Sequence, residues 1–166
     1  MNHVLADRYR RWFEYEKDSH AQVLATLETV PDAKRKRPAF KKAITLMAHL
    51  IAARQLWLFR MGLIAEPPTE FFPEDLSLAE LAGQIAAIHV AWTDILGRLH
   101  DDALAEMFEY QALDGSWFRN SVEDTLTQLY GHSLYHRGQI AQLLRSLGTE
   151  PPSTDFVFWT REPIVR

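Results

Sequence analysis

The sequence of 166 residues contains no cysteine, and this absence excludes several kinds of site at once. Disulfide frameworks, thiolate zinc sites, iron–sulfur clusters and cysteine nucleophiles all require a thiol. Imidazole and carboxylate groups remain as candidate metal ligands, and the chain has seven histidines. A chain of this length buries roughly 70% of its unfolded surface. We therefore expect a single domain over residues 1–166 whose core needs no metal, so that any metal site is functional.

Long basic stripes and long apolar runs are also missing. The chain has 18 Lys and Arg against 22 Asp and Glu, a net charge of −4 with histidine neutral. Its basic cluster, residues 34–37, lies between two prolines and is expected to be a solvated turn between helices. Nucleic-acid binding requires many clustered cations, so we expect none here. Asp7, Arg8, Arg10 and Arg11 stand where a signal segment would need apolar residues, and charges also interrupt the most apolar window, residues 46–65. We therefore expect a cytoplasmic protein without a signal segment or a membrane span.

Apolar residues recur with helical spacing in four long segments, at about residues 2–29, 39–64, 77–100 and 121–147. The pairs Ser77/Glu80 and Ser121/Asp124 are capping-box signatures at the start of the last two segments. Four helices of this length predict an all-α four-helix bundle. The short first connection suits antiparallel neighbours, whereas the loop of residues 65–76 is long enough for the third helix to run parallel to the second.

Two further segments lie outside these helices. The turn dipeptide Asp114-Gly115 separates residues 107–112 from residues 116–119, which predicts a small β-hairpin between the third and fourth helices. Gly148 is a typical helix-ending residue. The following segment, residues 150–159, has too much proline to continue the helix and too many aromatic residues for a floppy tail. We expect this irregular C-terminal tail to fold back over a groove or a partner subunit.

The apolar face of the fourth segment contains histidine. Its apolar positions alternate between spacings of four and three, and His136 stands where a leucine is expected, with the small Ser133 one turn earlier. His132 lies four residues before His136, which on a helix places the two Cβ atoms about 5–6 Å apart. That separation suits two imidazoles that hold one metal ion. A buried histidine is also often only a hydrogen-bonded core residue, so both interpretations stay open.

The other three helices also carry polar groups near their middles, which is how bundles build internal sites. His49 falls at the edge of the apolar stripe of the second segment, at a level that the histidine pair can reach. Glu16 and His20 lie on the apolar face of the first segment and His89 near that of the third. Each of these three is either part of a site or an ordinary hydrogen-bonded residue. Arg60 either holds an anionic group, extends to solvent or pairs with a carboxylate.

Motifs of other site types do not occur. A ferritin-like di-iron site needs Glu-x-x-His on two helices, and the chain has none. It also lacks His-Glu-x-x-His, Gly-x-Ser-x-Gly and a glycine loop for phosphate. His3 and His100 fall at helix ends and are expected at the surface.

Two motifs together resemble a known family. His132–Ile140, with its His-x-x-x-His-Arg-Gly-Gln core, and the following residues 144–152 are similar to the last-helix signature of the DinB/YfiT-like metal-binding bundles. This family is distinct from the DNA polymerase that shares the name. Leu46–Leu50 with Trp57 resembles the family's second-helix histidine motif, and the likeness extends over essentially the whole chain. The resemblance implies an up-down-down-up bundle and a homodimer.

The resemblance also implies a metal site and a chemistry. In the family pattern, His49, His132 and His136 are three ligands of one divalent ion, zinc or nickel, with open positions for water or substrate. Members of known chemistry resemble thiol-dependent transferases or isomerases that use a small external thiol. Three neutral imidazoles leave the ion's charge uncompensated, so a bound thiol or water is acidified.

These properties predict a metal-dependent S-transferase, isomerase or hydrolase. Glu16 or His20 would then act as general base or as a partner behind the ligands. An external thiol also fits a chain without cysteine. The alternative is a stress-response protein that binds a metal or small ligand without turnover.

Overall fold

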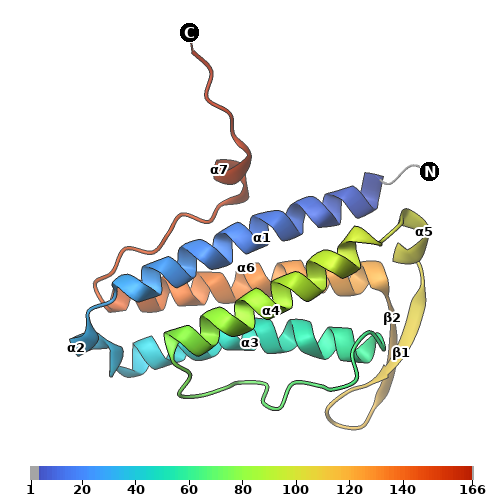
Figure 1. Cartoon of the computed structure of the whole chain (residues 1–166), viewed down its shortest axis with the longest axis horizontal. Coiled ribbons are helices and arrows are strands. Elements are labelled where there is room, and N and C mark those ends of the chain that lie inside the picture. The colour runs from blue at the N-terminus through green and yellow to red at the C-terminus, as the bar shows by residue number, and fades with distance from the viewer. Residues whose placement is uncertain (1–3, 166) are drawn as a thin grey trace.

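The structure, a computed structural model, describes residues 4–165 and is dominated by long helices. These are α1 (Val4–Thr29), α3 (Pro38–Arg60), α4 (Leu78–Gly97) and α6 (Val122–Ser146). Figure 1 shows α3 and α4 running in one direction and α1 and α6 in the other. The predicted bundle is therefore confirmed, with the up-down-down-up order. Within residues 4–165, no helix has the length and apolar character needed to cross a membrane.

The helix ends follow local signals in the sequence. The side chains of Ser77 and Ser121 accept hydrogen bonds from the backbone N–H three residues later, and both capping boxes are complete. Gly148 has a φ of 71° directly after the last turn of α6, as predicted. The second long helix ends at Arg60, however, and not at residue 64. The reason is Gly62, whose φ of 70° is left-handed and ends the helix.

Each long helix packs against two neighbours around one core. α1 contacts α4 and α6, and α3 contacts the same two helices from the other side. The loop after α3 runs back along the bundle before α4 begins, so α4 can lie parallel to α3 (Figure 1). Fully buried side chains from all four helices form the core, among them Leu27, Met47, Trp92 and Leu144.

The predicted core face of α6 is partly wrong. In α6 the core position expected for His136 belongs to Arg137, which is 4% exposed, whereas His136 is only partly buried. Arg137 can be buried because it donates hydrogen bonds to Ser133 Oγ and Tyr15 Oη.

The predicted hairpin forms where expected. β1 (Met107–Gln111) pairs with β2 (Trp117–Ser121) in antiparallel register, with Met107 opposite Ser121. The hairpin is preceded by the one-turn helix α5 (Asp101–Leu104). It closes one end of the bundle (Figure 1).

Residues 34 and 35 of the basic cluster lie in the short helix α2 (Asp32–Arg35), so the cluster is not only a solvated turn. Lys34 Nζ donates a 2.6 Å hydrogen bond to the carbonyl of Leu147. Arg35 Nε donates to the carbonyl of Val30 at 2.9 Å. These cations therefore satisfy carbonyl groups at the ends of α6 and α1.

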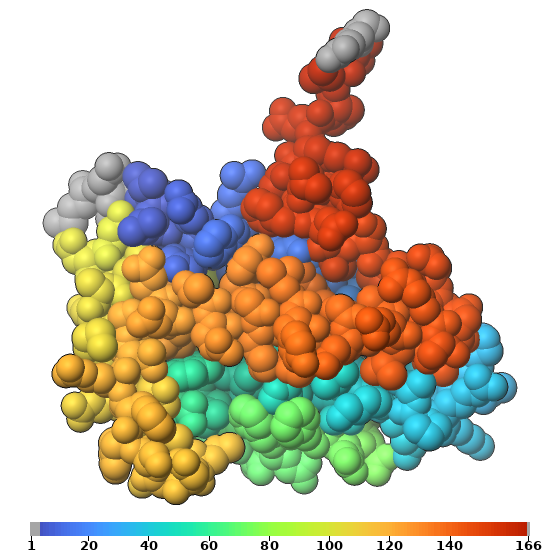
Figure 2. All heavy atoms as spheres, turned by 180° about the vertical axis from the view of Figure 1, so that it is seen from behind, coloured from blue at the N-terminus to red at the C-terminus, as the bar shows by residue number. Residues whose placement is uncertain are grey.

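The C-terminal segment folds back on α1, and it is not irregular throughout, because it contains a short helix, α7 (Phe156–Thr160). The Tyr15 hydroxyl donates to the carbonyl of Thr154. The rings of Phe156 and Trp159 lie 5.1 and 5.9 Å from that of Tyr15. Beyond α7 the chain projects away from the body of the bundle (Figures 1 and 2).

Candidate metal centre

Three histidine nitrogens converge between α3 and α6. Nε2 of His132 lies 3.1 Å from Nε2 of His49 and 2.9 Å from Nε2 of His136. The three ligand atoms all lie within 4.8 Å of one another. Metal–nitrogen bonds near 2.0–2.1 Å place nitrogens that share one ion about 3 Å apart. The spacing is therefore that of a group able to hold one ion.

Hydrogen bonds on the far side of two rings orient them for this role. Nδ1 of His49 donates to the carbonyl of Phe71 at 2.8 Å, because a carbonyl can only accept. Nδ1 of His136 lies 2.7 Å from Oε1 of Gln139, which likewise accepts the proton. A neutral imidazole protonated at Nδ1 has its lone pair at Nε2. Both rings thus direct lone pairs toward His132.

Protein atoms alone cannot satisfy this arrangement. His132 Nε2 can donate at most one proton, yet it faces two accepting nitrogens, those of His49 and His136. One of the two contacts therefore brings lone pairs together without a proton between them. A divalent cation at the shared position would accept all three lone pairs, so the donor set fits such an ion.

The electrostatic surroundings favour neutral imidazoles. Burial, followed by the neighbouring His136 and His49, lowers the pKa of His132 to about 4. Burial also lowers the pKa of His49. Both shifts favour the neutral imidazole over the imidazolium at neutral pH, and the neutral ring is the form that binds a metal.

Aromatic rings cover one side of the cluster and leave another side accessible. Phe72 stacks on His49 with ring centroids 4.0 Å apart, and Phe71 meets the same ring edge-on at 4.8 Å. Both phenylalanines come from the loop between α3 and α4. The sequence did not predict their place at the cluster, because helical periodicity identifies helix faces and not loop residues. His132 and His136 are partly exposed, so solvent or a small molecule can approach from their side.

Glu16 and His20 lie in a separate, buried polar network. Glu16 accepts two hydrogen bonds from Arg54, that from Nε measuring 2.7 Å. His20 lies 3.1 Å from His89 through Nδ1 and 3.4 Å from Ser133 Oγ through Nε2. Neither residue is one of the three converging ligands. Their link to the cluster runs through Ser133, the neighbour of His132.

The position of Arg54 in this network was not predicted from the sequence, because charged side chains are rarely buried. A signal was present, since an acid on an apolar face requires a partner. Arg54, in the middle of the most apolar window, provides it for Glu16.

The remaining predicted residues lie away from the cluster. The Arg60 guanidinium lies 4.8 Å from the ring of Trp57 and 4.6 Å from that of Tyr110. Within residues 4–165 it has no carboxylate within ion-pair distance, so of the three alternatives for Arg60 the carboxylate pair does not form. His100 is exposed, as expected, and His3 falls outside the described residues.

Comparison with known proteins places this architecture in a family. The model of the DinB family matches residues 1–163. The chain belongs to the DinB family. The fold of this DinB-family protein is also that of a crystal structure of a DinB-like protein from Bacillus cereus ATCC 10987. The two align with a TM-score of 0.70 and 21% identity, covering 92% of this chain and 99% of the other. No curated protein matches the chain.

Proposed function

We propose that this DinB-family protein binds one divalent metal ion through His49, His132 and His136. The convergence of their Nε2 atoms carries the proposal, because the hydrogen bonds of His49 and His136 direct lone pairs toward one point. Imidazole ligands suit both zinc and nickel, the two ions that we expect. The accessible side of the cluster leaves room for a further ligand.

We further propose that the protein is a metal-dependent enzyme. A divalent ion with three neutral ligands would lower the pKa of a coordinated thiol or water and polarise an electrophile. The chain itself would orient the ligand nitrogens and keep water from the side covered by Phe71 and Phe72. A small-thiol S-transferase is the activity we favour, because the likeness to the DinB family implies thiol-dependent chemistry, with isomerase or hydrolase chemistry as variants. Its thiol would be an external co-substrate, which is compatible with a chain that has no cysteine.

Glu16 and His20 are proposed as positioning residues for this reaction. The Glu16 carboxylate is occupied by Arg54, which argues against its use as a free general base. His20 contacts Ser133, and Ser133 lies in the ligand-bearing turn of α6, between His132 and His136. These contacts favour a role in holding α6 in place.

The alternative function is capture of a metal or small ligand without turnover, as in a stress-response protein. The same cluster supports it, since a site with an accessible position can bind without catalysing. Turnover of electrophiles with an added thiol distinguishes the two functions.

A cytoplasmic homodimer remains our expectation. The C-terminal segment supports association, because Val157 and Phe158 of α7 and Ile164 beyond it are 59%, 45% and 75% exposed. Apolar surface of this kind favours contact with a second chain. Sedimentation velocity tests the dimer, and a monomer at all concentrations would contradict it.

Elemental analysis of the tag-free protein, purified with zinc and nickel in the medium, tests the metal site. We expect about one ion per chain in the native protein, with most of it lost in His132→Ala and His136→Ala. His100→Ala, an exposed histidine outside the cluster, serves as the matched control and should keep its metal. Equal metal content in all four proteins would refute the site.

Turnover is measured next, with metal-loaded protein, several small thiols and a panel of electrophiles. A rate that disappears in His132→Ala supports an enzyme. Metal binding without any turnover supports the alternative.

A further inference from the structure

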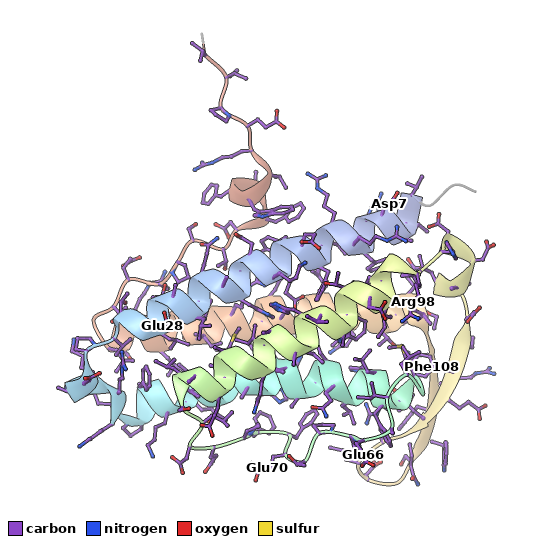
Figure 3. The ribbon with its side chains drawn as sticks, viewed as in Figure 1. Asp7, Glu28, Glu66, Glu70, Arg98 and Phe108 are labelled. Carbon is purple, nitrogen blue, oxygen red and sulfur yellow. The ribbon has the colours of Figure 1, made fainter. Side chains whose placement is uncertain are left out.

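The loop between α3 and α4 docks on the metal centre through His49. Residues 64–76 run along the outer side of the bundle, and Glu66 and Glu70 of this loop lie at the edge of the molecule (Figure 3). No residue of this loop is buried. Within residues 4–165, one hydrogen bond reaches the loop backbone, that from Nδ1 of His49 to the carbonyl of Phe71. The backbone of the loop is thus tied to the bundle by a metal ligand.

Aromatic contacts with the same histidine complete the docking. The ring of Phe72 lies parallel to that of His49, with 6° between the planes and 4.0 Å between the centroids. Phe71 meets the His49 ring edge-on at 4.8 Å. Near the far end of the loop, Lys41 pairs with Asp75 at 2.7 Å, but these side chains are 60% and 74% exposed. Exposed ion pairs contribute little to stability, so His49 is the main anchor of the loop.

The rest of the loop packs loosely. A cavity of about 370 Å³ lies between Pro68, Glu70 and Pro73 of the loop and the facing sides of α3 and α4. Segments with few buried contacts and exposed backbone open at a small cost in free energy. The loop can therefore leave its docked position while the four helices stay folded.

The His49 ring joins this loop to the other metal ligands. Its Nδ1 holds the carbonyl of Phe71, and its Nε2 faces Nε2 of His132 at 3.1 Å. Ligation through Nε2 keeps the ring proton on Nδ1, which is the form that donates to Phe71. Without an ion, the three converging nitrogens cannot all be satisfied. A turn of the His49 ring that relieves this conflict breaks both the hydrogen bond and the stacking with the loop.

We propose that residues 64–76 form a lid on the metal centre, and that Phe72 is a positioning residue through which lid docking and metal binding stabilise each other. The inference rests on the proposed metal site at His49, His132 and His136. Because such coupling is reciprocal, metal binding closes the lid by the same factor by which lid docking raises metal affinity. That factor is typically about 5–150-fold.

Limited proteolysis with endoproteinase Glu-C measures opening of the lid in the full-length protein. The protease cuts after Glu70, whose neighbour Phe71 is held on His49, and mass spectrometry follows this bond in metal-free and zinc-loaded protein. We expect cleavage to be about ten-fold faster in the metal-free protein. The exposed Glu106–Met107 bond at the hairpin end is the internal control and should be cut at equal rates.

Elemental analysis of the same samples separates this proposal from the proposed metal site. Bound zinc with equal cleavage rates after Glu70 would overturn the lid and leave the metal site standing. Faster cleavage of the metal-free protein at Glu70 and Glu106 alike would also overturn the lid, because it would report general loosening. Failure to bind zinc would overturn both proposals.

Phe72→Ala tests the reciprocal effect. Loss of the ring should weaken zinc binding about five-fold in competition with a calibrated chelator, and should speed cleavage after Glu70 in the zinc-loaded variant. Phe72→Tyr keeps the stacking and should bind zinc like the native protein. Phe118→Ala is the matched control, because Phe118 is 51% exposed and Phe72 49%, and it should change neither measurement. Native zinc affinity in Phe72→Ala, or an equal loss in Phe72→Tyr, would overturn the coupling.

Discussion

The buried carboxylate of Glu16 is held by the guanidinium of Arg54, with Nε donating to Oε1 at 2.7 Å. Glu16 is 1% exposed and Arg54 5% exposed, so neither charge has water to compensate it. The pair joins α1 to α3 across the core. Loss of this pair is therefore expected to lower the free energy of unfolding while the metal content stays unchanged.

Glu16→Gln tests this role. The substitution keeps the side-chain volume but leaves Arg54 as a buried cation without a counter-charge. We expect the free energy of unfolding to fall by about 3 kcal/mol in urea denaturation. Metal content should stay at the native level, and turnover should fall if the pair positions α6. Glu14→Gln removes a largely exposed carboxylate on the same helix and should cost about 0.5 kcal/mol or less. Similar losses in both variants would contradict the structural role of the buried pair.

Gln139 should tune metal affinity without touching the metal. Its Oε1 accepts the Nδ1 proton of His136 and so fixes the ring's tautomer. Removing such a partner typically weakens metal binding by about 10–100-fold, and we expect about ten-fold for Gln139→Ala. Competition with a calibrated chelator measures the effect. The exposed Gln142 lies one turn away from the contact, and Gln142→Ala should bind metal like the native protein. Unchanged affinity in Gln139→Ala would show that the hydrogen bond does not orient the ligand.

His89 should make stability depend on pH. Burial is the main cause that lowers its pKa from 6.5 to about 4, and Arg54 adds to it. The unfolded chain therefore binds a proton between these pH values while the folded chain does not, so stability falls as pH drops from about 6.5 toward 4. After allowance for solvent near this partly exposed ring, we expect about 1 kcal/mol from His89 between pH 7 and pH 5.

Urea denaturation of metal-free native protein and His89→Gln at both pH values measures this contribution. The variant should lose less stability on acidification than the native protein. His100→Gln controls for an exposed histidine. An equal pH dependence in native protein and His89→Gln would exclude His89 as a source.

Tyr15 should hold the C-terminal segment on α1. Its hydroxyl donates to the carbonyl of Thr154 and accepts from Arg137, and both contacts disappear in Tyr15→Phe. We expect faster limited proteolysis in residues 150–160 and about 1–2 kcal/mol less stability, because Arg137 loses a buried partner. Tyr135→Phe changes a tyrosine that is 64% exposed and should leave the cleavage rate unchanged. A native cleavage rate in Tyr15→Phe would assign the docking to the aromatic contacts alone.

Most of the architecture could be predicted from the amino-acid sequence, because the signals for helices and turns act locally. Apolar recurrence specifies helices, the Ser77 and Ser121 capping boxes mark two helix starts, and Asp114-Gly115 marks the hairpin turn. Three histidines could also be selected in advance, since their positions on helix faces and a family motif pointed to them. Helix ends were less certain where one glycine, Gly62, decided the last turn.

The polar partners of the buried side chains, in contrast, depend on tertiary packing. Arg54 and Arg137 are buried because residues distant in sequence, Glu16 and Tyr15, offer acceptors to them, and no periodicity encodes such a pairing. The same holds for the carbonyl of Phe71, which orients His49 from a loop. Local sequence sets the backbone through short-range sterics and hydrogen bonds. The polar partners of a site are set by packing, which depends on the whole chain.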